Sequence, residues 1–190
     1  MFGGVAMQPD LKMAEDFLAA LVMAPGRPFT FQTFAECLSA KLASSPPRIL
    51  HGPLAEHASE LTRLSSLGHG VFFMMNQGDG NGRKKSNVLN VIAAALDLDG
   101  APLEPVLAIQ TPPHIVVETS PRRWHAYWRL KDGTLNEFAL RQKALAKRFG
   151  GDPSICDVCR VMRLPGFIHQ KNPVTPFLSR VISIDGKAYK

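Results

Sequence analysis

The most informative segment of the chain is NVLNVIAAALDLDG, residues 87–100. Its apolar run lies between a glycine-rich loop and an Asp-Gly turn, and this pattern is typical of a buried β-strand. Side chains on a strand alternate between its two faces, so Asp97 and Asp99 would share one face about 7 Å apart while Leu98 points into the core. The sequence therefore predicts an apolar strand that ends in two neighbouring carboxylates.

Two carboxylates on one face repel each other unless a cation lies between them. Hard divalent ions such as Mg²⁺ and Mn²⁺ take oxygen ligands of this kind and keep open positions for water and phosphate. A solvated strand end that leads into an Asp-Gly turn would carry the same residues. Asp97 and Asp99 are thus candidates for a metal site, with a solvated strand end as the alternative reading.

Helices and strands are interspersed on both sides of this segment. Helical spacing of apolar residues predicts helices over 10–24, with Asp10 as the cap, over 54–67 and over about 135–149. Strands are expected at the start of 29–42, which turns helical toward its end, and at 70–76, 115–120, 123–130 and 177–184. This order predicts an α/β (α+β) fold, with a mixed or antiparallel sheet flanked by helices.

The inward faces of two of these helices can be named. In the helix over 54–67 and the helix over 135–149, the apolar side chains expected to face the core are Leu54, Leu61, Leu64, Leu67, Leu135, Phe138, Leu145 and Phe149.

Composition excludes several classes of protein. With 45% hydrophobic and 20% charged residues among 190, the chain is neither disordered nor of low complexity. No apolar run approaches the roughly 20 residues of a membrane helix, and acidic residues interrupt the N-terminal apolar stretch, unlike a signal peptide. Three cysteines are an odd and sparse set for a disulfide framework. We therefore expect a soluble cytoplasmic protein without a membrane partner.

The positive charge is unevenly distributed. Residues 1–78 carry a net charge of −1 and residues 79–190 a net charge of +7, so all of the formal excess of +6 lies in the second part. A basic region of this kind attracts polyanions, of which nucleic acid is the commonest. A basic surface kept for solubility is the alternative.

The segment RRWHAYWRL, residues 122–130, predicts a strand with two distinct faces. Trp124, Ala126, Trp128 and Leu130 would face the core, and the other face is expected to carry Arg123, His125, Tyr127 and Arg129. Arginine offers a planar fork and histidine a directional donor, so this second face suits phosphate oxygens. A histidine on a half-exposed strand is the alternative.

The segment CDVCRVMRLPGFIHQK, residues 156–171, contains a Cys-x-x-Cys pair. A structural zinc site needs four ligands, and the only other cysteine is the distant Cys37. No strand-then-helix pattern surrounds the pair, as a thioredoxin-like redox site would require. Cys156 and Cys159 are therefore interpreted as packing residues.

The loop QGDGNGRKK, residues 77–85, resembles a phosphate-binding loop but fails its pattern, because Lys84 stands where the glycine before Lys-Ser is required. It joins two strand-like runs, so we expect a glycine-rich hairpin. Its basic tip of Arg83, Lys84 and Lys85 is a candidate for contact with a nucleic-acid backbone.

The order of these segments resembles the archaeo-eukaryotic primase superfamily, whose three motifs are hydrophobic-D-x-D, s-x-H and hydrophobic-D. Here they would be Leu96–Asp99, Arg123–His125 and Cys156–Asp157. The closer similarity is to the catalytic domain of RepB-type replication primases of plasmids and phages. The stretches 70–105 and 160–173 and the FTFQTF segment carry this similarity, which covers most of residues 29–178.

The resemblance implies a DNA primase-polymerase with an RRM-like core, which transfers nucleotides to a 3′-hydroxyl on a single-stranded DNA template with two Mg²⁺ or Mn²⁺ ions. Asp97, Asp99 and Asp157 would hold the metal ions, and His125 would contact the triphosphate. Phosphoryl transfer asks the protein mostly for positioning and charge neutralisation, which such residues provide. The candidates for further phosphate or template contacts are Arg123, Arg160, Arg163, His169 and Lys171.

The chain departs from this family pattern in its second motif and in the expected lack of a helical accessory domain. Arg123 takes the place of the small hydroxyl residue of s-x-H, although Thr119 and Ser120 stand nearby.

We expect residues 1–190 to form one catalytic domain, with an αβ portion over about 1–78 and an RRM-like portion over about 79–190. The helical accessory domain of such primases is not expected within it, so a helical primase domain or a helicase would be a partner. The alternatives are a non-catalytic single-stranded-DNA-binding module and a metal-dependent nuclease.

Overall fold

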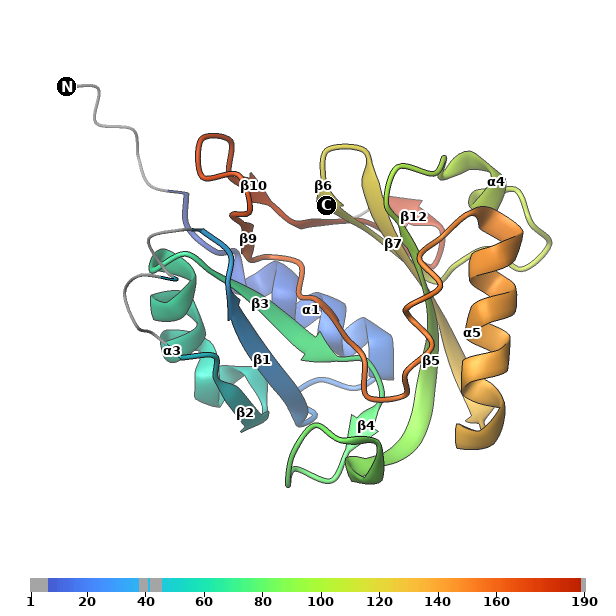
Figure 1. The fold of residues 1–190 in the computed structure, drawn as a ribbon, viewed down its shortest axis with the longest axis horizontal. Helices are drawn as coiled ribbons and strands as arrows, with labels where there is room; N and C mark the ends of the chain where they lie inside the picture. The colour runs from blue at the N-terminus through green and yellow to red at the C-terminus, as the bar shows by residue number, and fades with distance from the viewer. Residues whose placement is uncertain (1–6, 38–40, 42–45, 189–190) are drawn as a thin grey trace.

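The computed structural model describes residues 7–37, 41 and 46–188, which form two large antiparallel sheets and a two-stranded pair, with helices packed against the sheets (Figure 1). Every strand pair in these residues is antiparallel. The helices are α1 (Leu11–Val22), α3 (Leu54–Ser66), α4 (Glu104–Leu107), α5 (Leu135–Phe149) and the 3₁₀ turn η1 (Lys85–Asn87). The predicted α+β class is confirmed.

The first sheet has four strands in the order β2-β1-β3-β8. Their bounds are Phe29–Ala35 for β1, Ile49–Gly52 for β2, His69–Met74 for β3 and Val161–Arg163 for β8. The fourth strand comes from the distant segment 156–171, so the sheet brings residue 163 beside residue 72. This pairing carries the C-terminal part of the chain across the N-terminal sheet.

The second sheet has six strands in the order β12-β11-β6-β7-β5-β4, and it curls around one side of the molecule (Figure 1). Its strands are β4 (Gln77–Gly78), β5 (Val88–Leu98), β6 (Ile115–Ser120), β7 (Arg123–Gly133), β11 (Arg180–Ile184) and β12 (Lys187–Ala188). A separate two-stranded pair joins β9 (Ile168–His169) to β10 (Phe177–Leu178). The predicted strands over 70–76, 115–120 and 123–130 are confirmed within a few residues.

The main core lies between the two sheets and α1. Helix α1 begins at the predicted cap, where the carboxylate of Asp10 accepts a hydrogen bond from the backbone N–H of Met13 at 2.9 Å. Its buried Phe17 meets Phe73 of β3 and Tyr127 of β7 edge to face, at ring-centroid distances of 5.2 and 5.4 Å. Aromatic rings from three elements therefore join the two sheets.

A second core covers the outer face of the six-stranded sheet. Leu96, Leu98, Ala126 and Trp128 pack there with α4 and with the partly buried apolar face of α5. Both faces of β5 and β7 are thus covered. This corrects the sequence prediction for β7, because the face expected to be polar includes Tyr127, which is fully buried in the main core.

Two predicted core positions are wrong. Leu67 lies at the end of α3 and is 42% exposed, and Leu135 begins α5 and is also 42% exposed. Both lie at helix ends, where their side chains are exposed to solvent. The helix expected toward residue 42 falls largely outside the described residues. None of the described helices is both long and apolar enough to cross a membrane.

Candidate active site

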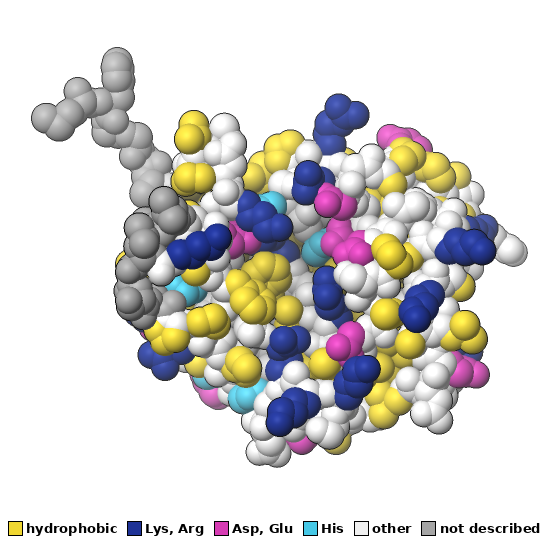
Figure 2. Space-filling view, in the orientation of Figure 1, with side chains coloured by type: hydrophobic (Ala, Val, Ile, Leu, Met, Phe, Trp, Pro, Cys, Tyr) yellow, Lys and Arg dark blue, Asp and Glu magenta, His cyan; other side chains and the backbone are white. Residues whose placement is uncertain are grey.

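The carboxylates of Asp97 and Asp99, at the end of β5, line a cleft on the protein surface. Asp97 is the last but one residue of β5, and Asp99 follows it in the turn; both line a cleft of about 270 Å³. Acidic, basic and histidine side chains gather in the upper middle of the same face (Figure 2). The residues that line the cleft come from β3, β5, β6, β7, β8, β9 and the segment after α5.

Strand pairing places His125 of β7 directly opposite Asp97 of β5. The His125 Nε2 atom lies 3.7 Å from Asp97 Oδ2. Burial alone would raise the pKa of Asp97, but His125, with smaller contributions from Arg160 and Lys171, lowers it below its ordinary value. Asp97 is therefore an ionised carboxylate at neutral pH.

Asp99 lies in a more open position. Its side chain is 59% exposed, and Oδ1 forms an ion pair with Arg123 Nη1 at 2.5 Å. Arg123 is half exposed, so the pair lies at the mouth of the cleft, where its charges are screened by water. The structure thus brings Asp97, Asp99, Arg123 and His125 together as the sequence predicted.

The third acid in the cleft is Asp152, which the sequence analysis did not single out. Its backbone N–H donates to the carbonyl oxygen of Asp97 at 2.9 Å, and its Oδ2 lies 3.9 Å from Arg160 Nη2. Asp152 also accepts hydrogen bonds from Ser154, which fix the orientation of the carboxylate.

The close approach of this segment to β5 depends on Gly151. A Cβ atom at this position would lie 2.9 Å from the carbonyl oxygen of Asp97 and 2.4 Å from a methyl carbon of Leu96. Any side chain would therefore collide with the strand. The Gly-Gly-Asp sequence at 150–152 was the available signal: one glycine ends α5 in the left-handed conformation, and the next lets the acid reach β5.

Asp157, the residue predicted to complete the metal site, does not line the cleft. Its carboxylate contacts the Cys159 thiol at 3.4 Å and Lys85 Nζ at 4.0 Å, near the glycine-rich loop. The Arg160 N–H donates to the Asp157 carbonyl oxygen at 2.9 Å, which closes a turn at this position. The structure therefore does not include Asp157 in the lining of the cleft with Asp97 and Asp99, whereas Asp152 lies there.

The cationic residues of segment 160–171 divide into two groups. Arg160 and Lys171 line the cleft and contribute positive charge near Asp97. Arg163 also lines it, but its guanidinium is buried, forms an ion pair with Glu36 and stacks over the Phe72 ring at 4.6 Å. Arg163 is thus already satisfied within the protein, which makes it a wall residue and not a free phosphate ligand.

Glu36 joins Arg163 of β8 to the backbone of Gln170, which follows β9. One of its oxygens accepts the backbone N–H of Gln170 at 2.8 Å, beside the His169 that was predicted to contact phosphate. His169 Nδ1 lies 3.0 Å from the Thr119 carbonyl oxygen, and burial lowers the pKa of His169. Thr119 and Ser120 also line the cleft, so hydroxyl groups and Arg123 are both present where the family pattern has one small hydroxyl residue.

The basic loop and the cysteines lie beside the cleft. Lys84 and Lys85 are exposed, whereas Arg83 donates through Nη1 to the Cys159 carbonyl at 3.0 Å. Cys159 is buried against Met74 and Val88, and burial, together with Asp157, raises the pKa of its thiol. These contacts agree with the packing role expected for Cys159.

The donor set of the cleft fits a hard divalent cation that is completed by other ligands. Among the described residues, no three His, Cys, Asp or Glu side chains converge closely enough to form a complete metal site. Mg²⁺ is commonly bound by one or two protein carboxylates, with waters and substrate phosphates in the remaining positions. Asp97 and Asp99 provide that number of carboxylates.

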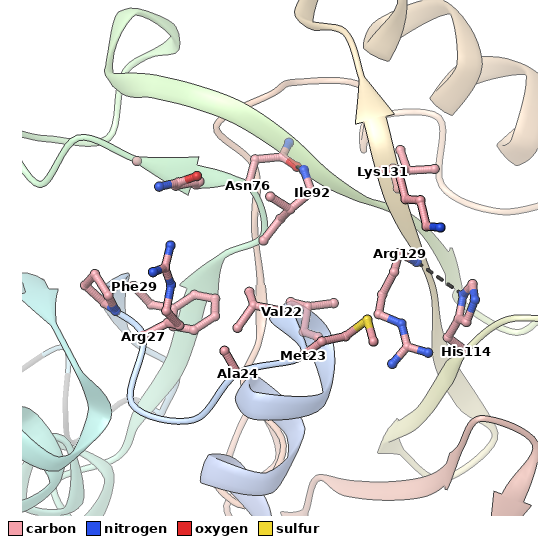
Figure 3. A pocket seen from close by; sticks show the side chains of 15 residues that line it. Val22, Met23, Ala24, Arg27, Phe29, Asn76, Ile92, His114, Arg129 and Lys131 are labelled. Atoms are coloured by element: carbon pink, nitrogen blue, oxygen red, sulfur yellow. Dashed lines mark hydrogen bonds between the residues drawn. The ribbon is translucent and has the colours of Figure 1, made fainter.

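A second, larger cavity of about 420 Å³ lies farther along β7 (Figure 3). Val22, Met23 and Ala24 at the end of α1 form one wall, and Arg129 and Lys131 of β7 form another. Arg129 donates to the carbonyl of Ala20 at 3.0 Å and forms an ion pair with Asp185. This cavity is lined mostly by apolar side chains.

Comparison with known proteins finds one family model and three solved structures that this chain resembles. Residues 94–181 match the family model of the RepB DNA-primase N-terminal domain, which covers all three cleft acids and His125. No curated protein matches the chain. The resemblance expected from the sequence is confirmed.

Three solved structures share the fold. The AEP domain of the cyanophage S-2L primase-polymerase matches 97% of this chain and 95% of its own, with a TM-score of 0.73 and 17% identity. Primase RepB′ matches with a TM-score of 0.68 and 20% identity, over 94% of this chain and 57% of its own. The catalytic domain of primase RepB′ in complex with initiator DNA gives 0.66 and 19%, over 92% and 85%. At these identities the similarity establishes the fold.

Proposed function

We propose that the chain is a template-dependent nucleotidyltransferase of plasmid or phage DNA replication, because residues 94–181 match the RepB DNA-primase N-terminal domain and the fold resembles that of a primase-polymerase. The observation that carries this proposal is the cleft, in which the acids Asp97 and Asp99 face the cations Arg160 and Lys171 within one concave site. Nucleotidyl transfer needs this combination, because triphosphates require cations and the divalent ions that accompany them require carboxylates.

The proposed metal ligands are Asp97 and Asp99. Asp152 lines the same cleft, and we propose that it supports the metal site in place of Asp157, which the sequence suggested. The low pKa of Asp97 keeps this ligand ionised. Mg²⁺ or Mn²⁺ bound there would activate the attacking hydroxyl and neutralise phosphate charge. The Arg123 side chain would be freed when its partner Asp99 binds a cation, and it could then reach a phosphate at the mouth of the cleft.

The reaction is a single displacement. The 3′-oxygen of the primer strand bonds to the α-phosphorus of the nucleoside triphosphate, the bond between the α-phosphorus and the bridging oxygen breaks, and pyrophosphate leaves. Arg160, Lys171 and His125 line the cleft, and we expect them to bind the phosphate oxygens and stabilise the charge of the leaving group. Arg163 acts through packing, since Glu36 already occupies its guanidinium.

The proposed template is single-stranded DNA. One of the solved structures of this fold is described as a complex of a primase catalytic domain with initiator DNA. In this chain the positive charge is concentrated in residues 79–190, and Lys84 and Lys85 are exposed beside the cleft. Backbone contacts of this kind predict DNA affinity that falls steeply with salt and depends little on sequence.

A primer-extension assay tests the proposal. The protein is incubated with a labelled primer on a single-stranded template, with Mg²⁺ or Mn²⁺ and with each set of nucleoside triphosphates in turn. Lengthening of the primer that requires both metal and nucleotides is the expected result. Shortening without nucleotides would identify a nuclease, and DNA binding without metal-dependent nucleotide affinity would identify a non-catalytic binding module; either result would reject the proposal.

A further inference from the structure

The hydroxyl of Tyr127 lies in an unusual place for a core residue. Tyr127 is fully buried, and its ring packs between the Phe17 and Phe73 rings of the main core. Its hydroxyl lies 3.0 Å from Nδ1 of His125, two residues earlier on the same face of β7. A phenylalanine would fill the same space, so the hydroxyl is not needed for packing.

The available donors and acceptors determine which group donates in the hydrogen bond between Tyr127 and His125. Burial, with a further contribution from the charge of Asp97, raises the pKa of Tyr127 well above its ordinary value, so the phenol keeps its hydrogen. Among the contacts of the described residues, His125 Nδ1 is the only hydrogen-bond partner of that hydroxyl. A buried hydroxyl that donates to nothing is costly, so the hydroxyl donates and Nδ1 accepts.

The other ring nitrogen then carries the hydrogen. Nε2 of His125 points toward Oδ2 of Asp97, 3.7 Å away, at the wall of the cleft. In the opposite tautomer, the Nε2 lone pair would face a carboxylate and the phenol hydrogen would have no acceptor. The contact of His125 with Tyr127 and its contact with Asp97 therefore both favour hydrogen on Nε2.

We infer that Tyr127 is a positioning residue, which holds His125 as the Nε2–H tautomer so that the imidazole presents a donor to the nucleotide's phosphate oxygens. Phosphate oxygens only accept hydrogen bonds, so the other tautomer would present a lone pair and repel them. The role in nucleotide binding rests on the proposed function, whereas the tautomer itself does not.

Histidine ¹⁵N NMR of the full chain tests the tautomer directly. The chain has six histidines, and the signals of His125 are assigned by comparison with His125→Gln. The expected spectrum of His125 shows hydrogen on Nε2 and a lone pair on Nδ1. In Tyr127→Phe the preference should weaken to a mixture of the two tautomers. An Nδ1–H ring or an imidazolium in the unaltered protein, or an unchanged ring in Tyr127→Phe, would overturn the inference.

A matched control separates positioning from packing. Phe73→Leu removes an aromatic neighbour of Tyr127 but leaves the hydroxyl, so the His125 spectrum should stay unchanged. The unaltered protein, Tyr127→Phe and Phe73→Leu are then titrated with a nonhydrolysable deoxynucleoside triphosphate and Mn²⁺ by calorimetry. Tyr127→Phe should bind roughly tenfold more weakly, and Phe73→Leu within about twofold of the unaltered protein.

The NMR spectrum and the nucleotide titration can each reject one claim while leaving the other intact. If the unaltered protein shows the Nε2–H ring but binds no nucleotide, the proposed function is rejected and the hydrogen-bond assignment stands. If nucleotides bind equally well to the unaltered protein and to Tyr127→Phe, the positioning role is rejected and the proposed function stands. The spectrum of the unaltered protein decides the tautomer even if Tyr127→Phe does not fold.

Discussion

The cleft and the second cavity lie along the same face of β7, yet they are built from different chemistry. The face runs from His125 in the cleft, past buried Tyr127, to Arg129 in the second cavity, a distance of about 13 Å along the strand. The second cavity is larger, about 420 Å³ against about 270 Å³, but no acidic side chain lines it in the described structure. The cleft combines three aspartates with arginine, lysine and histidine side chains.

The two concavities thus differ more in the charge of their lining than in their volume. Apolar walls with a few cations can hold a hydrophobic anion, but without a carboxylate they do not suit a hard divalent ion. Acids and cations within one concavity can bind a divalent ion and a polyphosphate together. The smaller cleft is therefore the candidate active site.

The largest effect is expected from removing the two strand-end acids. Asp97→Ala combined with Asp99→Ala should reduce primer extension by at least about 10³-fold, because metal coordination contributes several kcal/mol to such reactions. The melting temperature should remain close to that of the unaltered protein, which circular dichroism would establish.

The matched control removes two charges from the second cavity. Arg27→Ala combined with Lys131→Ala should leave extension within about threefold of the unaltered protein, as surface changes away from a site usually do. Retained activity in the double aspartate variant, or a large loss in this control, would contradict the assignment of chemistry to the cleft.

The next effect concerns the wall of the cleft. Glu36→Gln leaves the buried Arg163 guanidinium without its countercharge, so the free energy of unfolding should fall by about 3 kcal/mol. Urea unfolding measures the change. Glu60→Gln breaks the exposed pair with Arg63 and serves as control, with no measurable change expected. Equal effects of the two substitutions would mean that the Glu36–Arg163 pair is not buried as described.

A smaller effect distinguishes the two candidates for the third acid. Asp152→Asn should lower extension activity and Mn²⁺ affinity by about 10- to 100-fold, the range expected when a group that supports a metal site is neutralised. Asp157→Asn, which changes an acid outside the cleft, should alter both by less than about threefold. The reverse order of the two variants would restore the assignment made from the sequence.

The smallest effect belongs to the second cavity. Met23 ends α1 in the left-handed conformation, with φ of 56°, and its side chain is 78% exposed. Met23→Gly should raise the free energy of unfolding by up to about 1 kcal/mol, because glycine adopts this conformation without strain. Extension activity should not change. A loss of stability measured by urea unfolding would show that the Met23 side chain contributes packing that outweighs the strain.

Local patterns were sufficient to predict the strands and part of the cleft. The alternation in residues 87–100 placed Asp97 and Asp99 correctly, because a strand's two-residue period fixes which side chains share a face. The same period placed His125 and Tyr127 on one face of β7. It could not show that this face is buried beneath α1, since that depends on a helix more than 100 residues earlier.

The remaining parts of the cleft depend on long-range contacts. Asp152 and Asp157 lie in the same irregular segment, and only the approach of Gly151 to β5 decides which of them reaches Asp97. The partner of Arg163 is Glu36, which lies 127 residues away in sequence, so no local pattern identifies it. Spacing along the chain predicts faces of elements, but it does not predict how irregular segments cross them.

Gly151 also has a consequence for variation at this site. The separation between the Asp97 and Asp152 backbones is set by direct contact of two main chains, without any intervening side chain. A single added methyl group would widen that spacing, and no change of carboxylate length at either end could restore both orientations. A sequence that keeps every acid but replaces this glycine could therefore fold and still be unable to hold the acids at their working distance.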